Sequence, residues 1–211
     1  MNNLQINEHF LEVLNLKKTS YKFLLNDFSE EVVKKAKSFL ENTDKSLPIF
    51  VFAPATTWYN KHWDVENWAG LTKIYSNKAN IIFTGTDKDK NYVDEIIKKA
   101  NVEKNIINLT GKTNLKELYE LVKNSDLVIS PDSGTAHIAW ASEHPYVITI
   151  FTSTSKNRTG PIGEKCITIS SDLECQPCMK KKCNLKKDKN LCMKSLNYQE
   201  VSSIIDKLFF E

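Results

Sequence analysis

The stretch "DLVISPDSGTAHIAW" at residues 126–140 runs from an apolar segment directly into a segment of helical periodicity. Its first residues have the length and composition of a buried strand. Asp132, Ser133 and Gly134 then lead into the helical segment without a loop. A strand that turns straight into a helix presents the helix's unpaired N–H groups at the edge of the sheet, where the helix dipole favours an anion. The stretch therefore predicts one strand–helix unit of an α/β protein, with an anion site at the turn.

The rest of the chain repeats this alternation of strand-length apolar runs and helical segments, as a parallel α/β sheet requires. Asp64 and Asn114 are suited to cap two of the helices. We therefore expect an α/β fold with a Rossmann-like parallel sheet and helices on both faces. The expected strands are 48–53, 80–84, 105–109, 126–130 and 146–151. The other expected helices are 29–42, 64–77, 88–101, 114–125 and 197–210.

Composition and charge exclude several classes of protein. The chain has 211 residues, 41% of them apolar, which can supply a core without cross-links. Its 29 basic and 26 acidic residues give a net charge of +3, and the scattered lysines argue against a dedicated nucleic-acid surface. The apolar runs are too short to span a bilayer, and the first ten residues do not resemble a signal peptide. We expect a cytoplasmic protein, with a peripheral place at the inner membrane face as an alternative.

Polar residues follow each expected strand, at the edge where an open α/β sheet binds its ligands. At the turn, Gly134 would let a phosphate approach the backbone, and Ser133 and Thr135 can donate hydroxyl hydrogens to it. Asp132 is anionic and suits sugar hydroxyls better. A simpler interpretation is that Asp132 or Ser133 only caps an empty helix. A serine hydrolase is disfavoured, because His137 lies on the helix that Ser133 precedes and the G-x-S-x-G turn is missing.

Several motifs, in order along the chain, carry a resemblance to a known family. The most specific is "SPDSGTAHIAWASEHPYVITIF" at 130–151. It is supported by "NLTGKTNLKELYELV", by "KHW" at 61–63, by "RTGP" at 158–161 and by the cysteine-rich tail that ends in "CMKSLNYQEV". Together they resemble glycosyltransferase family 9, the ADP-heptose:lipopolysaccharide heptosyltransferases, from residue 48 to about residue 205.

The resemblance implies a GT-B fold, in which two Rossmann-like domains enclose the site and the C-terminal domain binds most of the nucleotide-sugar donor. Residues 46–211 would be this donor-binding domain, with a cysteine-rich loop at 166–194 and a C-terminal helix. Residues 1–45 would be a helical remnant of the acceptor-side domain, or a linker. The implied function is transfer of a sugar, from ADP-heptose or a similar donor, to a lipopolysaccharide core acceptor.

The resemblance also implies roles for individual residues. Lys61 would stabilise the leaving diphosphate, Asp132 would contact the sugar, and Asp89, with Asp87 as its rival, would bind the ribose. The remaining donor-binding residues would be Ser133, Gly134, Thr135, His137, Thr110 and Gly111. A cation and oriented N–H groups can stabilise the leaving charge without a metal, so no cofactor is expected. The general base lies on the acceptor-side domain in this family. We therefore expect the chain to bind donor but transfer poorly, and to pair with itself or with an acceptor-side chain.

Departures from the family pattern leave alternatives open. Where the family usually has Pro-Gly, Trp-Pro and Gly-Pro, this chain has Pro-Ala at 54–55, Trp-Asp at 63–64 and Thr-Ser at 152–153, so the donor could differ from ADP-heptose. Lys61 could instead be a solvated lysine lying over an aromatic ring. The competing functions are a non-catalytic nucleotide-binding module and a sugar-nucleotide epimerase. His137 and "RTGP" favour the transferase over the epimerase.

Four of the five cysteines are closely spaced. Cys175, Cys178, Cys183 and Cys192 form the pattern C-x2-C-x4-C-x8-C, while Cys166 stands apart. In a cytosolic chain this spacing points to a structural metal before a disulfide, although only one C-x2-C pair is present. The other interpretation is a reduced or locally cross-linked loop.

Overall fold

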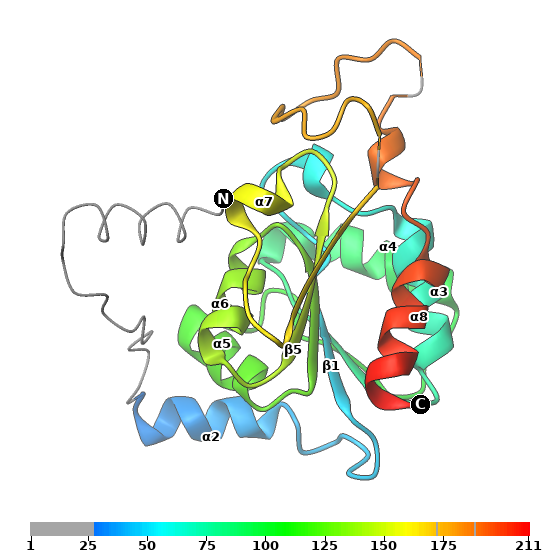
Figure 1. Cartoon of the computed structure of the whole chain (residues 1–211). Helices are drawn as coiled ribbons and strands as arrows, with labels where there is room; N and C mark the ends of the chain where they lie inside the picture. The colour runs from blue at the N-terminus through cyan, green and yellow to red at the C-terminus, as the bar shows by residue number, and fades with distance from the viewer. Residues whose placement is uncertain (1–27, 172, 188) are drawn as a thin grey trace, which may run out of the picture.

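The fold is a six-stranded, wholly parallel sheet in the order β3-β2-β1-β4-β5-β6 (Figure 1). The computed structural model describes residues 28–211, except 172 and 188. The strands are β1 (Ile49–Phe52), β2 (Asn80–Phe83), β3 (Ile106–Asn108), β4 (Leu127–Pro131), β5 (Tyr146–Phe151) and β6 (Cys166–Ser170). The strand order reverses between β1 and β4, as in Rossmann-like proteins. The predicted fold class is thus confirmed, while the expectation for residues 1–27 lies outside the described residues.

Helices connect the strands and cover both faces of the sheet (Figure 1). The α-helices are α2 (Glu30–Ser38), α3 (Val65–Tyr75), α4 (Lys90–Ala100), α5 (Leu115–Lys123), α6 (Gly134–Ser142), α7 (Lys156–Thr159) and α8 (Tyr198–Phe209). Short 3-10 helices are η1 (Tyr59–Lys61), η2 (Asp87–Asp89) and η3 (Leu191–Met193). The predicted caps are confirmed: Asp64 accepts a hydrogen bond from the N–H of Glu66, and Asn114 accepts from those of Lys116 and Glu117.

Alternate residues of each strand supply two separate cores. In β1, Phe50 and Phe52 pack into a cluster that includes residues of α3, α4 and α8, whereas Val51 belongs to a cluster with residues of α5 and α6. All three side chains are fully buried. Each fully buried large apolar side chain contributes about 1.5–3 kcal/mol to stability, so burial on both faces of the sheet strongly stabilises the strands. The loops at the carboxyl ends of these strands are therefore fixed to a rigid base.

The C-terminal part of the chain returns to α3. The indole N–H of the buried Trp63 donates to the carbonyl of Leu196 at 2.8 Å, and the backbone N–H of Tyr198 donates to the side-chain oxygen of Asn67 at 3.0 Å. Further along, the Tyr75 hydroxyl donates to the Ser202 carbonyl at 2.9 Å. These contacts dock α8 on the same face as α3.

The sequence prediction missed one strand and placed one loop wrongly. β6 pairs in parallel with β5, so Cys166 lies in an edge strand and not in a cysteine-rich loop. The segment Cys-Ile-Thr-Ile-Ser alternates apolar and polar side chains and is only half-buried, and it lacks the continuous apolar run of the inner strands. The helix expected at 29–42 is present as the shorter α2, which packs against α5.

Candidate functional site

Lys61 and Asp132 meet where the strand order reverses. Lys61 ends η1, which follows β1, and Asp132 directly follows β4, the neighbour of β1. The Lys61 Nζ donates to Asp132 Oδ2 at 2.7 Å and to the Asp132 backbone carbonyl at 3.1 Å. The two side chains are only 17% and 8% exposed. The sheet therefore brings two predicted site residues into a largely buried ion pair at the edge where such folds bind ligands.

The second carboxylate oxygen of Asp132 faces two further polar groups. The Thr159 hydroxyl donates to Asp132 Oδ1 at 3.4 Å, and His137 Nε2 lies 3.8 Å from the same oxygen. Thr159 comes from α7, and His137 from the first turn of α6. Sequence reasoning did not select Thr159, although it lies within "RTGP" at 158–161. Asp132 is thus held from three sides while its oxygens keep lone pairs that can accept hydrogen bonds from hydroxyl groups.

The start of α6 has no side-chain cap. Ser133 occupies the N-cap position, but its side chain makes no capping hydrogen bond; its Oγ lies 2.6 Å from the Ser130 Oγ. A Cβ atom added at Gly134 would meet no heavy atom within 4 Å. The interpretation of Ser133 as a side-chain cap is therefore wrong, and the carboxylate of Asp132, the alternative cap, accepts hydrogen bonds from Lys61 and Thr159 instead. The first turn, which includes Thr135, begins beside open space, the arrangement in which helix N–H groups bind an anion.

Aromatic contact holds Lys61 from a second side. Its Nζ lies 4.9 Å from the centre of the Trp58 ring, and Lys181 Nζ lies 5.5 Å from the same ring. Lys61 does lie over a ring, as the alternative interpretation expected, but it is mostly buried and paired with Asp132 rather than solvated. A cation fixed by both a ring and a carboxylate is already ordered before any ligand arrives.

On the β2–β3 side, Asp89 acts as a local cap. Its Oδ2 accepts hydrogen bonds at 2.7 Å from both the N–H and the hydroxyl of Thr86. Asp87 instead forms an exposed ion pair with Lys90 at 2.5 Å. Gly111 has a φ of +75°, and a Cβ there would lie 2.9 Å from Asp87 Oδ1. The structure therefore brings Asp87 next to Gly111, while Asp89 serves the start of the following helix. The Thr-x-x-Asp spacing of a capping box could have revealed that role.

Buried hydroxyl groups lie behind the strand ends. The hydroxyl oxygens of Thr84, Thr110, Ser153 and Thr154 are buried and have no hydrogen-bond partner among residues 28–211, with 172 and 188 left aside. They follow β2, β3 and β5. A buried hydroxyl without a hydrogen-bond partner costs about 1–3 kcal/mol. These four hydroxyls therefore have unused hydrogen-bonding groups near the strand ends, which a water or a ligand would satisfy.

The sequence as a whole matches one protein family. Residues 4–189 match glycosyltransferase family 9 (heptosyltransferase). The chain belongs to this family. A lipooligosaccharide heptosyltransferase 2 of Campylobacter jejuni is 33% identical over 153 residues, which cover 70% of this chain and 47% of that protein. The chain thus spans about half the length of the curated relatives that it matches.

Solved structures confirm that the fold matches one half of GT-B heptosyltransferase structures. The glycosyltransferase family 9 structure from Veillonella parvula superimposes with a TM-score of 0.79 at 19% identity, over 99% of this chain and 60% of that one. The E. coli heptosyltransferase WaaC with ADP gives a TM-score of 0.62 at 19% identity, over 97% of this chain and 55% of that one. The predicted family, Rossmann-like half and GT-B type are therefore confirmed.

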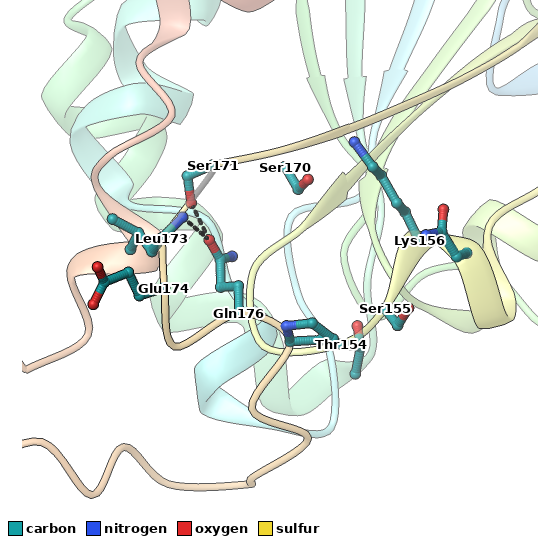
Figure 2. Close-up of a pocket in the computed structure, with 10 residues that line it drawn as sticks. Thr154, Ser155, Lys156, Ser170, Ser171, Leu173, Glu174 and Gln176 are labelled. Atoms are coloured by element: carbon teal, nitrogen blue, oxygen red, sulfur yellow. Dashed lines mark hydrogen bonds between the residues drawn. The ribbon is translucent and has the colours of Figure 1, made fainter.

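The chain also has a cavity of about 410 Å³ between the ends of β5 and β6 (Figure 2). It is lined by Thr154 of the loop after β5, by residues of α7 such as Lys156, and by the segment after β6, which includes Glu174. Gln176 closes one side: its Oε1 accepts from the Ser171 hydroxyl at 2.6 Å, and its amide donates to the carbonyl of Thr152. Sequence reasoning did not identify this cavity.

The cysteines are free thiols of different acidity. No three or more His, Cys, Asp or Glu side chains in the described part of the chain are arranged to hold a metal ion, although Cys175, Cys178 and Cys183 lie near enough to Cys192 to help raise its pKa. Burial raises the pKa of the Cys166 and Cys192 thiols to about 11. Backbone N–H groups of Asn190 and Leu185 lower the pKa of Cys183. In addition, none of the described helices is both long and apolar enough to cross a bilayer.

Proposed function

We propose that this chain is the donor-binding part of a heptosyltransferase. It would hold a nucleoside-diphosphate sugar, ADP-heptose or a close analogue, whose sugar passes to a lipopolysaccharide core acceptor. The uncapped start of α6 beside the Lys61–Asp132 pair is the observation that carries the proposal. The family match, the heptosyltransferase names of the relatives and the ADP bound to E. coli WaaC support the choice of donor.

In this proposal the diphosphate binds at the first turn of α6. Ser133, Gly134 and Thr135 offer backbone N–H groups and two hydroxyls, and the space beside Gly134 is open. Lys61 supplies the positive charge as the diphosphate leaves, and His137 contributes a further polar contact from the first turn. Fixed N–H groups and a fixed cation stabilise developing negative charge without reorganising. The transfer would require no cofactor.

Asp132 would accept hydrogen bonds from the sugar hydroxyls. Its carboxylate keeps Lys61 in place, and its remaining acceptor capacity lies beside His137 and Thr159. A carboxylate would repel a bare phosphate, so its position next to an anion site is useful mainly when a sugar is attached. We therefore expect Asp132 to distinguish a nucleotide sugar from the diphosphate alone.

The nucleoside would lie on the β2–β3 side. Asp87 is better placed than Asp89 to bind the ribose hydroxyls, because Asp89 Oδ2 already accepts two hydrogen bonds from Thr86. Gly111 gives close access beside Asp87, and the buried hydroxyl of Thr110 lies behind it.

The acceptor would bind elsewhere. The carboxylate at this site, Asp132, is committed to Lys61, so we infer that the general base and most acceptor contacts come from an acceptor-side domain. Tyr59 is 61% exposed beside Lys61 and would face that domain or a second protein chain.

Calorimetric titration with ADP in the presence of a metal chelator tests the site. We expect binding without added metal, and Lys61→Ala and Thr135→Ala each to weaken it by about 1–3 kcal/mol as charge-assisted hydrogen bonds are lost. Lys73→Ala is the matched control, because Lys73 is exposed on α3. Unchanged ADP affinity in both site variants would refute the assignment.

The same titration with ADP-heptose tests the sugar contact. Asp132→Asn should lower affinity for the nucleotide sugar more than affinity for ADP. Equal losses for the two ligands would contradict the proposed role of Asp132.

A further inference from the structure

Positive charge is concentrated in one segment, residues 178–194, which we call the basic segment. It contains seven lysines and one aspartate, whereas the whole chain carries a net charge of only +3. The rest of the chain is therefore net acidic. All seven lysine side chains are exposed. A strongly basic surface on an otherwise acidic protein indicates an anionic partner.

Large aliphatic side chains are exposed in and around the same lysines. Met179, Leu185 and Leu191 are 41%, 44% and 40% exposed. The basic segment contains no arginine and no aromatic residue. Nucleic-acid surfaces typically use arginines and aromatic rings that stack on bases. Lysines mixed with exposed aliphatic side chains are instead typical of surfaces that lie in the head-group region of a membrane.

The protein body holds the segment at both ends and presents its middle. Near the start, the N–H of Met179 donates to the carbonyl of Ser153 at 2.8 Å, and the side chain of Asn60 donates to the carbonyl of Lys180 at 3.2 Å. Near the end, Met193 is buried. Between these points the described residues of the segment, 188 left aside, project beyond the body at the end of the molecule where α7 lies (Figure 1). It therefore extends from the same edge of the sheet that carries Lys61 and Asp132.

We propose that the basic segment docks this protein on an anionic lipid bilayer. The lysines would lie among lipid phosphates, and Met179, Leu185 and Leu191 would enter the interface between head groups and acyl chains. Each lysine near an anionic bilayer strengthens binding by about fivefold, so three of them contribute about 100-fold. Docking through this segment would turn the edge of the sheet that carries Lys61 toward the lipid surface. The inference rests on charge and exposure and does not depend on the proposed donor.

Vesicle co-sedimentation of the purified chain tests the proposal. The protein should sediment with equimolar phosphatidylglycerol and phosphatidylcholine, but not with phosphatidylcholine alone, and added salt should release it. The triple variant Lys186→Gln, Lys187→Gln and Lys189→Gln should lose about 100-fold in vesicle affinity. The matched control is Lys34→Gln, Lys35→Gln and Lys37→Gln on α2, which removes the same charge from exposed positions outside the basic segment and should bind nearly as the wild type.

Further measurements separate lipid from other anions. Leu185→Asn leaves the charge unchanged and should weaken binding to the mixed vesicles. Circular dichroism reports whether each variant remains folded. ADP titration reports whether donor binding is independent of vesicle binding. Equal losses in the two lysine triples would overturn the proposal, as would equal binding to both kinds of vesicle. Tighter binding to duplex DNA than to the mixed vesicles, or no effect of Leu185→Asn, would also overturn it in favour of a soluble polyanion.

Discussion

Gly134→Ala should separate ligand binding from folding at the start of α6. The added Cβ would meet no heavy atom within 4 Å, so the protein accommodates it without a clash. Alanine is favoured over glycine by at most about 1 kcal/mol within a helix, so the free energy of unfolding should stay equal or rise slightly. The new methyl group would, however, occupy the space in which a phosphate approaches the backbone. Loss of one charge-assisted hydrogen bond costs about 1.5–3 kcal/mol, which weakens ADP binding about 10- to 150-fold.

Gly70→Ala is a control that should change stability and leave ADP binding unchanged. A Cβ at Gly70 would lie 2.6 Å from the ring of Tyr198, so this variant should be overpacked by about 1–3 kcal/mol while the ADP site stays intact. Thermal unfolding should show a melting temperature lower by about 2–4 °C for each kcal/mol, and calorimetry should show unchanged ADP affinity. If Gly134→Ala is folded and binds ADP as tightly as the wild type, the diphosphate does not lie at the start of α6 and the reasoning fails.

Three other results are expected. Lys61→Met leaves the Asp132 carboxylate buried without its cation and should lower the free energy of unfolding, measured in urea, by about 3 kcal/mol. Adding Asp132→Asn to this variant should restore part of the lost stability. Strictly additive losses in the double variant would mean that the two side chains are not coupled. Near pH 8, iodoacetamide should modify Cys183 before Cys166 and Cys192, because a lowered pKa leaves more of the thiol as thiolate. Raising the pH toward 11 should narrow the difference between the modification rates. Equal rates near pH 8, measured by peptide mass spectrometry, would contradict this prediction. With ADP-heptose and a deacylated lipopolysaccharide core, the chain alone should transfer sugar far more slowly than about 1 per second, and turnover at that rate would place the general base within these residues.

The sequence predicted most of the sheet because its inner strands are continuous apolar runs between amphipathic helices. The helix caps Asp64 and Asn114 were predictable for the same local reason, since a cap depends only on residues within one turn. The edge strand β6 was missed because one of its faces is less covered, which shortens the apolar signal to two isoleucines. Local pattern therefore predicts buried elements well and edge elements poorly.

The site was only partly predictable. The turn at Asp132 and the helix start at Gly134 lie next to each other in sequence, and pattern was enough to find them. The ion pair of Lys61 with Asp132 joins residues 71 positions apart and depends on β1 lying beside β4, which no local pattern contains. The capping role of Asp89 was predictable from Thr86, three residues before it. The contact of Thr159 with Asp132 was not predictable, because α7 is a single turn whose position depends on the whole sheet.

The contacts that hold α8 have a consequence for how this chain can vary. Trp63 with Leu196 and Tyr75 with Ser202 join the C-terminal part to α3 and to the residues just before it, without involving the projecting middle of the basic segment. A broken peptide bond in that middle would leave two pieces still held together by their packed faces. Insertions and deletions there would likewise change a surface without rebuilding the sheet, since lengthening a connection costs little free energy. The sequence and length of the basic segment can therefore differ between relatives according to the surface that each one binds, while the sheet keeps its structure.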